Sequence, residues 1–332
     1  MRIDSPQRYQ EPEFLPWDGR RVPLTFVGGY LGAGKTTAIN ELLASADRPI
    51  AVVVNDVGSV NIDARLIRRQ TSDLIELTDG CVCCSAIDGM GAALDAIRAR
   101  PVPPDHVVVE LSGVADPQRM IPWGHSAGFR LDGLVVVAAA DQLLPRSLPV
   151  TVMDQICAHI SAADLILLTK TDLVDGQAAH VARELLARVA PHIPVVESAD
   201  FALKPGALGR LLALGGRRSG DVIETPDPSM FDLHEVTTID APPTGTLSEL
   251  RLWLNKLLES NQGREHNQLS HQRHNQRQLV RAKAVLDTTD CGLVLVQIVG
   301  ARVEIEKLPA PEQQQPTQVI VITVRAAPAR LE

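Results

Sequence analysis

The sequence predicts an α/β fold in which a parallel sheet carries helices on both faces, followed by a smaller α+β unit. From residue 22 onward, short apolar runs rich in β-branched residues alternate with helical stretches. Such alternation is typical of a parallel sheet that is covered on both sides. The alternation breaks at residues 216–230, which are dense in Gly, Pro, Arg and Asp. Beyond this break, apolar runs follow one another around a single amphipathic stretch, which indicates an antiparallel sheet with one helix.

The first unit is expected to alternate strands and helices along the chain. Strands are predicted at residues 23–28, 50–55, 107–111, 134–140, 165–169 and 195–198. Helices are predicted between them, at residues 36–46, 88–99, 152–162 and 176–189. Ligands of such sheets bind at the carboxyl ends of the strands, so we expect functional residues directly after the strands.

The second unit is expected to hold one helix and five strands. The helix is predicted at residues 247–259, and the strands at residues 233–239, 280–286, 293–299, 302–306 and 319–324. Four leucines share one stripe of this helix: Leu247, Leu250, Leu254 and Leu257. We therefore expect one helix face to pack on the sheet. Residues 261–278 are rich in Asn, Gln and His and are predicted to form a loop.

The length of the chain, 332 residues, suggests about two domains. We expect a first domain at residues 22–215 and a second domain at 231–325, joined by a linker at 216–230. A polar, Pro-rich leader is expected at residues 1–21 and a tail at residues 326–332.

The composition excludes several classes of protein. Hydrophobic residues make up 45% and charged residues 22%, as in globular proteins. The net charge of −8 and the 3% of aromatic residues argue against a nucleic-acid partner. The apolar runs stop well short of the ~18 residues that a spanning helix needs, so we expect no membrane partner and a cytoplasmic location.

Residues 29–36 read Gly-Tyr-Leu-Gly-Ala-Gly-Lys-Thr and match the P-loop spacing between a predicted strand and a predicted helix. Glycines let backbone N–H groups curl around phosphates at the start of a helix. Lys35 is expected to contact the β- and γ-phosphates, and the Thr36 hydroxyl to hold Mg²⁺. We further expect Lys35 to lie on an exposed loop and to contribute little to folding. The pattern predicts a nucleoside triphosphate site.

Two further motifs refine this site. Glu110 ends an apolar run, where such folds place a carboxylate that orients Mg²⁺, and Gly113 follows where a backbone N–H could sense the γ-phosphate. The alternative for Glu110 is a charge at the start of a helix. Thr169-Lys170-Thr171-Asp172 follows another apolar run and is similar to the Asn-Lys-x-Asp motif with which GTPases read guanine. Threonine replaces its asparagine.

Three of the five cysteines, Cys81, Cys83 and Cys84, lie within four positions. Such thiolates can converge on one soft cation such as Zn²⁺, whose fourth ligand the sequence does not identify. The alternatives are buried cysteines that act as small apolar residues, or a redox pair. Cys157 and Cys291 lie singly in apolar stretches and are expected in the core.

The motifs stand in one order along the chain: residues 29–37, 55–58, 76–84, 110–117 and 169–173. This order resembles the CobW family of P-loop GTPases, relatives of the UreG and HypB nickel chaperones. Residues 281–302 resemble the C-terminal domain of that family. The resemblance implies a GTP-hydrolysing metallochaperone that loads Zn²⁺, Co²⁺ or a similar ion into an unidentified client protein.

The resemblance also implies roles for individual residues. The expected nucleotide-binding residues are Gly29, Gly32, Ala33, Gly34, Lys35, Thr36, Thr37, Gly113, Lys170 and Asp172. Lys35 and Glu110 are expected to serve catalysis, and the expected Mg²⁺ ligands are Thr36, Asp56 and Glu110. Asp56 stands where the family usually has glutamate. The expected ligands of the delivered metal are Cys81, Cys83 and Cys84.

Two other functions remain open from the sequence. The first is a metal buffer or sensor without enzymatic activity, which binds nucleotide as a marker of its state. The second is an ATP-using small-molecule kinase in which the clustered cysteines are structural. The rate of hydrolysis and the preference between GTP and ATP distinguish these from a GTPase.

Overall fold

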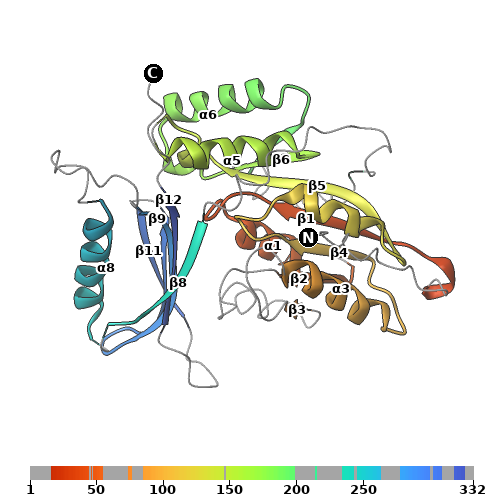
Figure 1. Cartoon of the computed structure of the whole chain (residues 1–332), viewed down its shortest axis with the longest axis horizontal. Helices are drawn as coiled ribbons and strands as arrows, with labels where there is room; N and C mark the ends of the chain where they lie inside the picture. The colour runs from red at the N-terminus through yellow and green to blue at the C-terminus, as the bar shows by residue number, and fades with distance from the viewer. Residues whose placement is uncertain are drawn as a thin grey trace, which may run out of the picture.

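A computed structural model of the chain contains two sheets (Figure 1). The structure describes residues 16–44, 46, 48–54, 74–76, 85–145, 147–198, 214, 234–242, 245–262, 277–299, 302–308 and 318–325. Several predicted features lie outside these residues: most of the leader, the linker, Asp56, the clustered cysteines, most of the histidine-rich loop and the tail.

The larger sheet, called here the parallel sheet, has seven strands. They are β1 (Val22–Gly28), β2 (Ile50–Val54), β3 (Leu74–Glu76), β4 (His106–Glu110), β5 (Phe129–Ala139), β6 (Leu165–Thr169) and β7 (Val195–Glu197). Their spatial order is β3-β2-β4-β1-β5-β6-β7, and every pair is parallel. This confirms the predicted parallel sheet. β3 was not predicted, because its Leu-Ile-Glu run is too short to give a strand signal.

Both faces of the parallel sheet are buried, as the continuous apolar runs predict. Val107 and Val109 of β4 belong to one buried cluster with residues of α3 (Ser85–Arg98), α5 (Val150–Ser161) and α6 (Gly176–Val189), whereas Val108 belongs to a second cluster with α1 (Lys35–Ala44). The remaining helices here are short: α4 (Pro117–Met120), η1 (Trp17–Gly19), η2 (Ile121–His125), η3 (Ala140–Gln142) and η4 (Thr171–Leu173).

The second sheet, called here the C-terminal sheet, is antiparallel. Its strands are β8 (His234–Asp240), β9 (Arg277–Thr288), β10 (Gly292–Val299), β11 (Arg302–Lys307) and β12 (Gln318–Arg325), in the order β11-β10-β9-β12-β8. The helix α8 (Leu247–Gln262) packs on one face through the buried Leu250 and Leu254, which confirms the predicted stripe. Thr246 and Glu249 bond to each other's backbone N–H, and this capping box fixes the start of α8.

The two sheets share one hydrophobic core. Val280, Ile322 and Val324 of the C-terminal sheet are buried in the same cluster as Phe26 and Leu134 of the parallel sheet. In Figure 1 the C-terminal sheet stands with α8 on its outer face and the parallel sheet on the other side. The C-terminal sheet is therefore packed against the rest of the structure rather than tethered to it.

Two polar contacts join the same parts of the chain. Tyr30, which follows β1, is hydrogen-bonded to His234 of β8, with 2.8 Å between the hydroxyl oxygen and Nε2. Burial lowers the pKa of His234 to about 4 and raises the pKa of Tyr30, so both side chains are neutral at pH 7. Arg302 of β11 donates to Asp141, which follows β5, at 3.2 Å. Both contacts lie beside the carboxyl edge of the parallel sheet.

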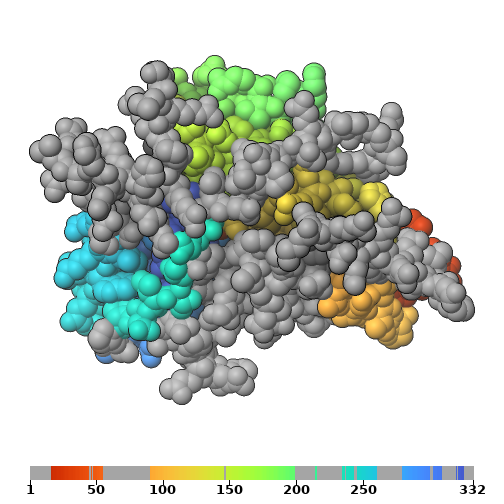
Figure 2. All heavy atoms as spheres, in the orientation of Figure 1, coloured from red at the N-terminus to blue at the C-terminus, as the bar shows by residue number. Residues whose placement is uncertain are grey.

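In the space-filling view, α6 lies at the top of the molecule and α8 at its left (Figure 2).

In the described part of the chain, no helix is long and apolar enough to cross a membrane. Cys157 on α5 and Cys291 before β10 are half-buried and form no disulfide. Both were expected in the core: neither is fully buried, and Cys291 packs against the cluster beneath α8.

His106, at the start of β4, is buried without contact to water. Thr25 donates its hydroxyl hydrogen to Asp132 at 3.0 Å, and its oxygen lies 2.7 Å from His106 Nε2, which therefore donates. Burial is the main cause that lowers the pKa of His106 to about 4; Asp132 opposes the shift, and two nearby arginines, Arg48 and Arg130, add to it. The histidine is thus held neutral in the folded protein.

We predict that His106 makes the protein less stable in mild acid. Its pKa is about 4 when folded and about 6.5 when unfolded, so between these values the unfolded chain binds the extra proton. The free energy of unfolding should fall as the pH drops from 7 to 5, and this site should account for about 2 kcal/mol of the fall. Urea denaturation of the native protein and of His106→Gln at both pH values measures it. An equal fall in both proteins would contradict this assignment.

Candidate functional site

The P-loop connects β1 to α1 and is held by its own lysine. The Nζ atom of Lys35 donates to the carbonyl oxygens of Gly29 at 3.0 Å and Tyr30 at 3.3 Å. Only 6% of Lys35 is exposed, so the expectation that it lies on an exposed loop is wrong. The reason is that the loop curls over the first turn of α1, and the ammonium group bonds the carbonyls of that curl.

The backbone of the loop demands glycine at its first position. Gly29 has a φ of +127°, and a Cβ atom there would collide with the carbonyl oxygen of Val137 on β5. No other residue avoids both this collision and the strained backbone. The pairing of β1 with β5 therefore brings the loop close to the sheet.

Thr36 and Glu110 meet at the carboxyl edge of the parallel sheet. The Thr36 hydroxyl, in the first turn of α1, donates to Oε1 of Glu110 at the end of β4 at 3.0 Å. Glu110 is 3% exposed. A hydroxyl and a carboxylate are oxygen donors of the kind that Mg²⁺ takes in nucleotide sites, so these residues fit that ion. Gly113 lies nearby, against Leu31 of the P-loop.

The segment that follows β6 is tied to the P-loop. Thr169 donates to the carbonyl oxygen of Ala33 at 2.6 Å, so threonine links the two segments. Lys170 adopts a left-handed backbone with a φ of +58°, and burial lowers the pKa of its ammonium group, with Asp141 opposing the shift. Asp172 is exposed on η4, two residues further on.

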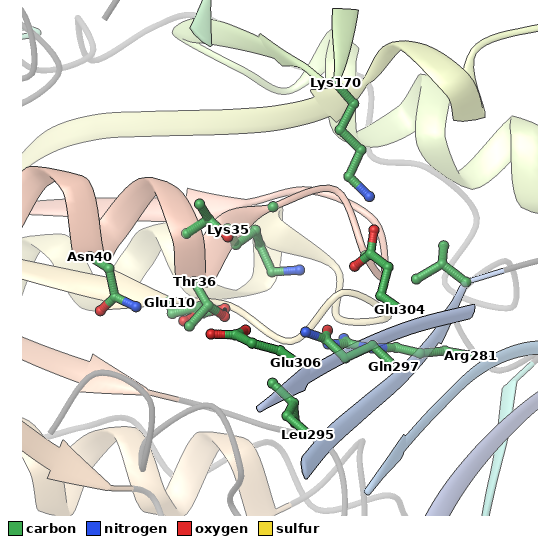
Figure 3. A pocket seen from close by; sticks show the side chains of 14 residues that line it. Lys35, Thr36, Asn40, Glu110, Lys170, Arg281, Leu295, Gln297, Glu304 and Glu306 are labelled. Atoms are coloured by element: carbon green, nitrogen blue, oxygen red, sulfur yellow. Dashed lines mark hydrogen bonds between the residues drawn. The ribbon is translucent and has the colours of Figure 1, made fainter. Parts of the chain in front are cut away.

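A pocket of about 290 Å³ opens between the P-loop and the C-terminal sheet (Figure 3). Several residues singled out from the sequence line it together: Gly32, Gly34, Lys35, Thr36, Thr37, Glu110 and Lys170. Gly29 and Ala33 support the loop from outside the pocket, and neither Gly113 nor Asp172 is part of its lining. The structure thus gathers most of the phosphate-binding candidates into one cavity.

Other lining residues escaped the sequence analysis. Asn40 follows Thr36 by one turn of α1, so helical spacing could have indicated it. The rest come from the C-terminal sheet: Arg281, Leu295, Gln297, Val299, Glu304 and Glu306. No local motif marks these six, because the packing of one sheet on another brings them to the P-loop. The C-terminal sheet therefore lines the same pocket as the P-loop.

The clustered cysteines lie outside the described residues, between the end of β3 and the start of α3. Within the residues that are described, no three His, Cys, Asp or Glu side chains gather as a metal site. The chain positions on either side are informative. Val54 at the end of β2 is in register with both Glu76 of β3 and Glu110 of β4. The segment with the cysteines therefore starts from the same edge that carries Glu110.

Comparison with known proteins agrees with this geometry. Residues 23–197, more than half of the chain, match the family model described as CobW/HypB/UreG, nucleotide-binding domain. The chain is 29% identical over 234 residues to a zinc chaperone CobW of Sinorhizobium sp, covering 61% of this chain and 65% of that protein. It is 33% identical over 184 residues to the zinc chaperone YjiA of Escherichia coli strain K12, covering 52% and 56%.

The matches span between about half and two thirds of the length of these two curated relatives. Among solved structures, a Zn(II)-bound YjiA GTPase from E. coli aligns with 93% of this chain and 96% of its own, at 22% identity and a TM-score of 0.40. The match to the family model covers β1, the P-loop, Glu110 and the segment after β6. The chain therefore belongs to the CobW/HypB/UreG family, the P-loop GTPase family of metallochaperones.

Proposed function

We propose that this protein hydrolyses GTP and uses the cycle to deliver Zn²⁺, or a similar ion such as Co²⁺, to a client protein. The observation that carries the proposal is the approach of Thr36 to Glu110 beside the buried Lys35, at the carboxyl edge of the parallel sheet. These are the groups that phosphoryl transfer requires in this kind of fold. The zinc-chaperone names of two relatives support the choice of metal.

Each part of the site has a chemical task in this proposal. The N–H groups at the start of α1 bind phosphate oxygens, and Lys35 moves from its loop carbonyls to the phosphates. Thr36 and Glu110 would hold Mg²⁺, which when bound neutralises negative charge on the β- and γ-phosphates. Asp56 would join them as a ligand. Glu110 would also orient the attacking water, because a carboxylate at this edge faces the terminal phosphate.

The base would bind beside Lys170 and Asp172. The bond from Thr169 to the P-loop holds this segment at a fixed distance from the phosphate site. The exposed Asp172 can accept two hydrogen bonds from guanine, and adenine does not present the same donors. The aliphatic part of Lys170 would cover the sugar and base.

The transported ion would bind at Cys81, Cys83 and Cys84. Thiolates prefer Zn²⁺ over Mg²⁺, so the transported ion and the Mg²⁺ that accompanies the nucleotide would bind at different sites. The segment that holds these cysteines leaves the sheet at Glu76, in register with the strand end that bears Glu110. A movement at the γ-phosphate would therefore reach the cysteines along a short path.

We predict that Lys35→Ala lowers the rate of GTP hydrolysis by about 100-fold or more, because it removes a cation that stabilises negative charge in the transition state. The loss of two buried hydrogen bonds should also lower the free energy of unfolding by about 1–2 kcal/mol. Phosphate release and urea denaturation without nucleotide measure the two effects. Hydrolysis at the native rate would exclude the P-loop as the catalytic site.

We predict that the native protein prefers GTP to ATP and that Asp172→Ala removes most of this preference. A site that pairs with the polar edge of a base rejects the wrong base strongly, since its own groups would be left without partners. Competition of GDP and ADP against a fluorescent nucleotide measures it, with Asp175→Ala, a nearby helix cap, as the control. Equal affinity for both nucleotides in the native protein would favour the kinase alternative.

We predict that Zn²⁺ and GTP change each other's affinity by about 5- to 150-fold, which is the usual range of allosteric coupling. Zn²⁺ titrations with GDP, with a non-hydrolysable GTP analogue and without nucleotide measure the factor. Cys83→Ser should abolish the coupling, whereas Cys157→Ser, on α5, should preserve it. Three superimposable titrations of the native protein would refute the chaperone mechanism while leaving the GTPase activity open.

A further inference from the structure

A β-bulge in β9 re-aims two consecutive side chains. Ile322 of β12 pairs with Arg281, but the next residue of β12 pairs with Leu279, so Val280 is passed over. Leu279 and Ala282 pack in the cluster beneath α8, whereas Val280 packs in the core of the parallel sheet. The extra residue therefore brings Val280 and Arg281 onto the same face, towards the P-loop. Bulges next to functional sites commonly redirect a side chain in this way.

The strand register holds Arg281 at the P-loop. Arg281 is the direct partner of Val299 on β10. Val299 packs against Gly32, which has a φ of +72° and where an added Cβ would collide with the valine side chain. Arg281 is thus paired with the residue of β10 that contacts the phosphate-binding loop. Hydrogen-bonded strands on both sides fix its backbone.

Arg281 is 9% exposed and lines the pocket with Lys35 and Thr36. In Figure 3 it extends from the C-terminal sheet towards the side of the pocket that these two residues form. Burial is the main cause that lowers the pKa of Lys170 and raises the pKa of Tyr30; the charge of Arg281 adds to the first shift and opposes the second. Arg281 therefore acts electrostatically across the pocket.

The charges that line the pocket are balanced only if Arg281 is counted. Among the described residues, the cations are Lys35, Lys170 and Arg281, and the carboxylates are Glu110, Glu304 and Glu306. Arg281 is therefore one of the three lining cations that can attract a phosphate chain.

We propose that Arg281 is a nucleotide-binding residue: the C-terminal sheet supplies its guanidinium in cis to the phosphate chain of the bound nucleotide. This inference rests on the proposed GTP site and extends it to a second wall. A planar guanidinium can bond two phosphate oxygens at once, which an ammonium group cannot do.

Binding of fluorescent GDP and of a fluorescent non-hydrolysable GTP analogue tests the proposal. Arg281→Gln should weaken both by about 10- to 100-fold, the range of charge-assisted hydrogen bonds. Arg281→Lys should recover part of this loss, since it keeps the charge and loses the paired geometry. The matched control is Arg251→Gln on the exposed side of α8, which should bind both nucleotides as the native protein does.

Guanosine separates phosphate binding from a purely structural role, because it lacks phosphates. Its affinity, measured by calorimetry, should be the same for the native protein and Arg281→Gln. An equal loss of guanosine and GDP affinity would overturn the proposal, and so would native GDP affinity in Arg281→Gln. If that variant fails to fold, Arg281→Lys decides: a threefold or greater loss for GDP supports the proposal, and native affinity refutes it.

The same titrations distinguish this inference from the proposed function. If the native protein binds GDP and Lys35→Ala weakens it while Arg281→Gln does not, only the role of Arg281 is refuted. If the native protein binds neither nucleotide, the GTP site itself is refuted, and the role of Arg281 with it.

Discussion

Because all strands of the seven-stranded sheet run parallel, their carboxyl ends meet at one edge, and the phosphate-binding side of the candidate site depends on this constraint. The P-loop leaves β1 there, Glu110 ends β4 there, and Lys170 follows β6 there. A pairing shift of one residue between β1 and β4 would turn Glu110 to the other face of the sheet, away from Thr36. The register of Val27 with Glu110 thus holds the two oxygen donors at 3.0 Å.

The second wall of the pocket depends on a different kind of contact. The C-terminal sheet packs into the core of the parallel sheet through Val280, Ile322 and Val324. In addition, Tyr30 of the phosphate-binding loop is hydrogen-bonded to His234. The P-loop is therefore packed from both sides, by β5 through Val137 and by the C-terminal sheet. A conformational change of the loop would therefore first displace these two neighbours.

The elements and the first wall of the site could be predicted from local sequence, because helical and strand periodicity and the P-loop spacing are local properties. The boundaries of β6 and α6 agree with the prediction, while β5 begins at Phe129 rather than at residue 134. That extension contains Arg130, Asp132 and Gly133, whose polarity and flexibility hide a strand. β5 pairs with β1 there across a bulge, so tertiary pairing decides the conformation.

The second wall could not be predicted in this way. Arg281 reaches the pocket through a bulge, a strand register and the packing of two sheets, none of which leaves a mark within a short window of sequence. The burial of Lys35 was missed for a related reason, because a P-loop motif specifies the spacing of residues but not which carbonyls its lysine bonds.

The strand order of the C-terminal sheet has a consequence for the synthesis of the protein. β12 lies between β9 and β8, so the sheet cannot close until residues 318–325 have left the ribosome. The parallel sheet and the P-loop are synthesised earlier. Until then, the surface that later contacts Val280, Ile322 and Val324 stays exposed. The nascent chain therefore exposes an apolar face beside an incomplete pocket, and a chaperone bound during that interval would cover that face.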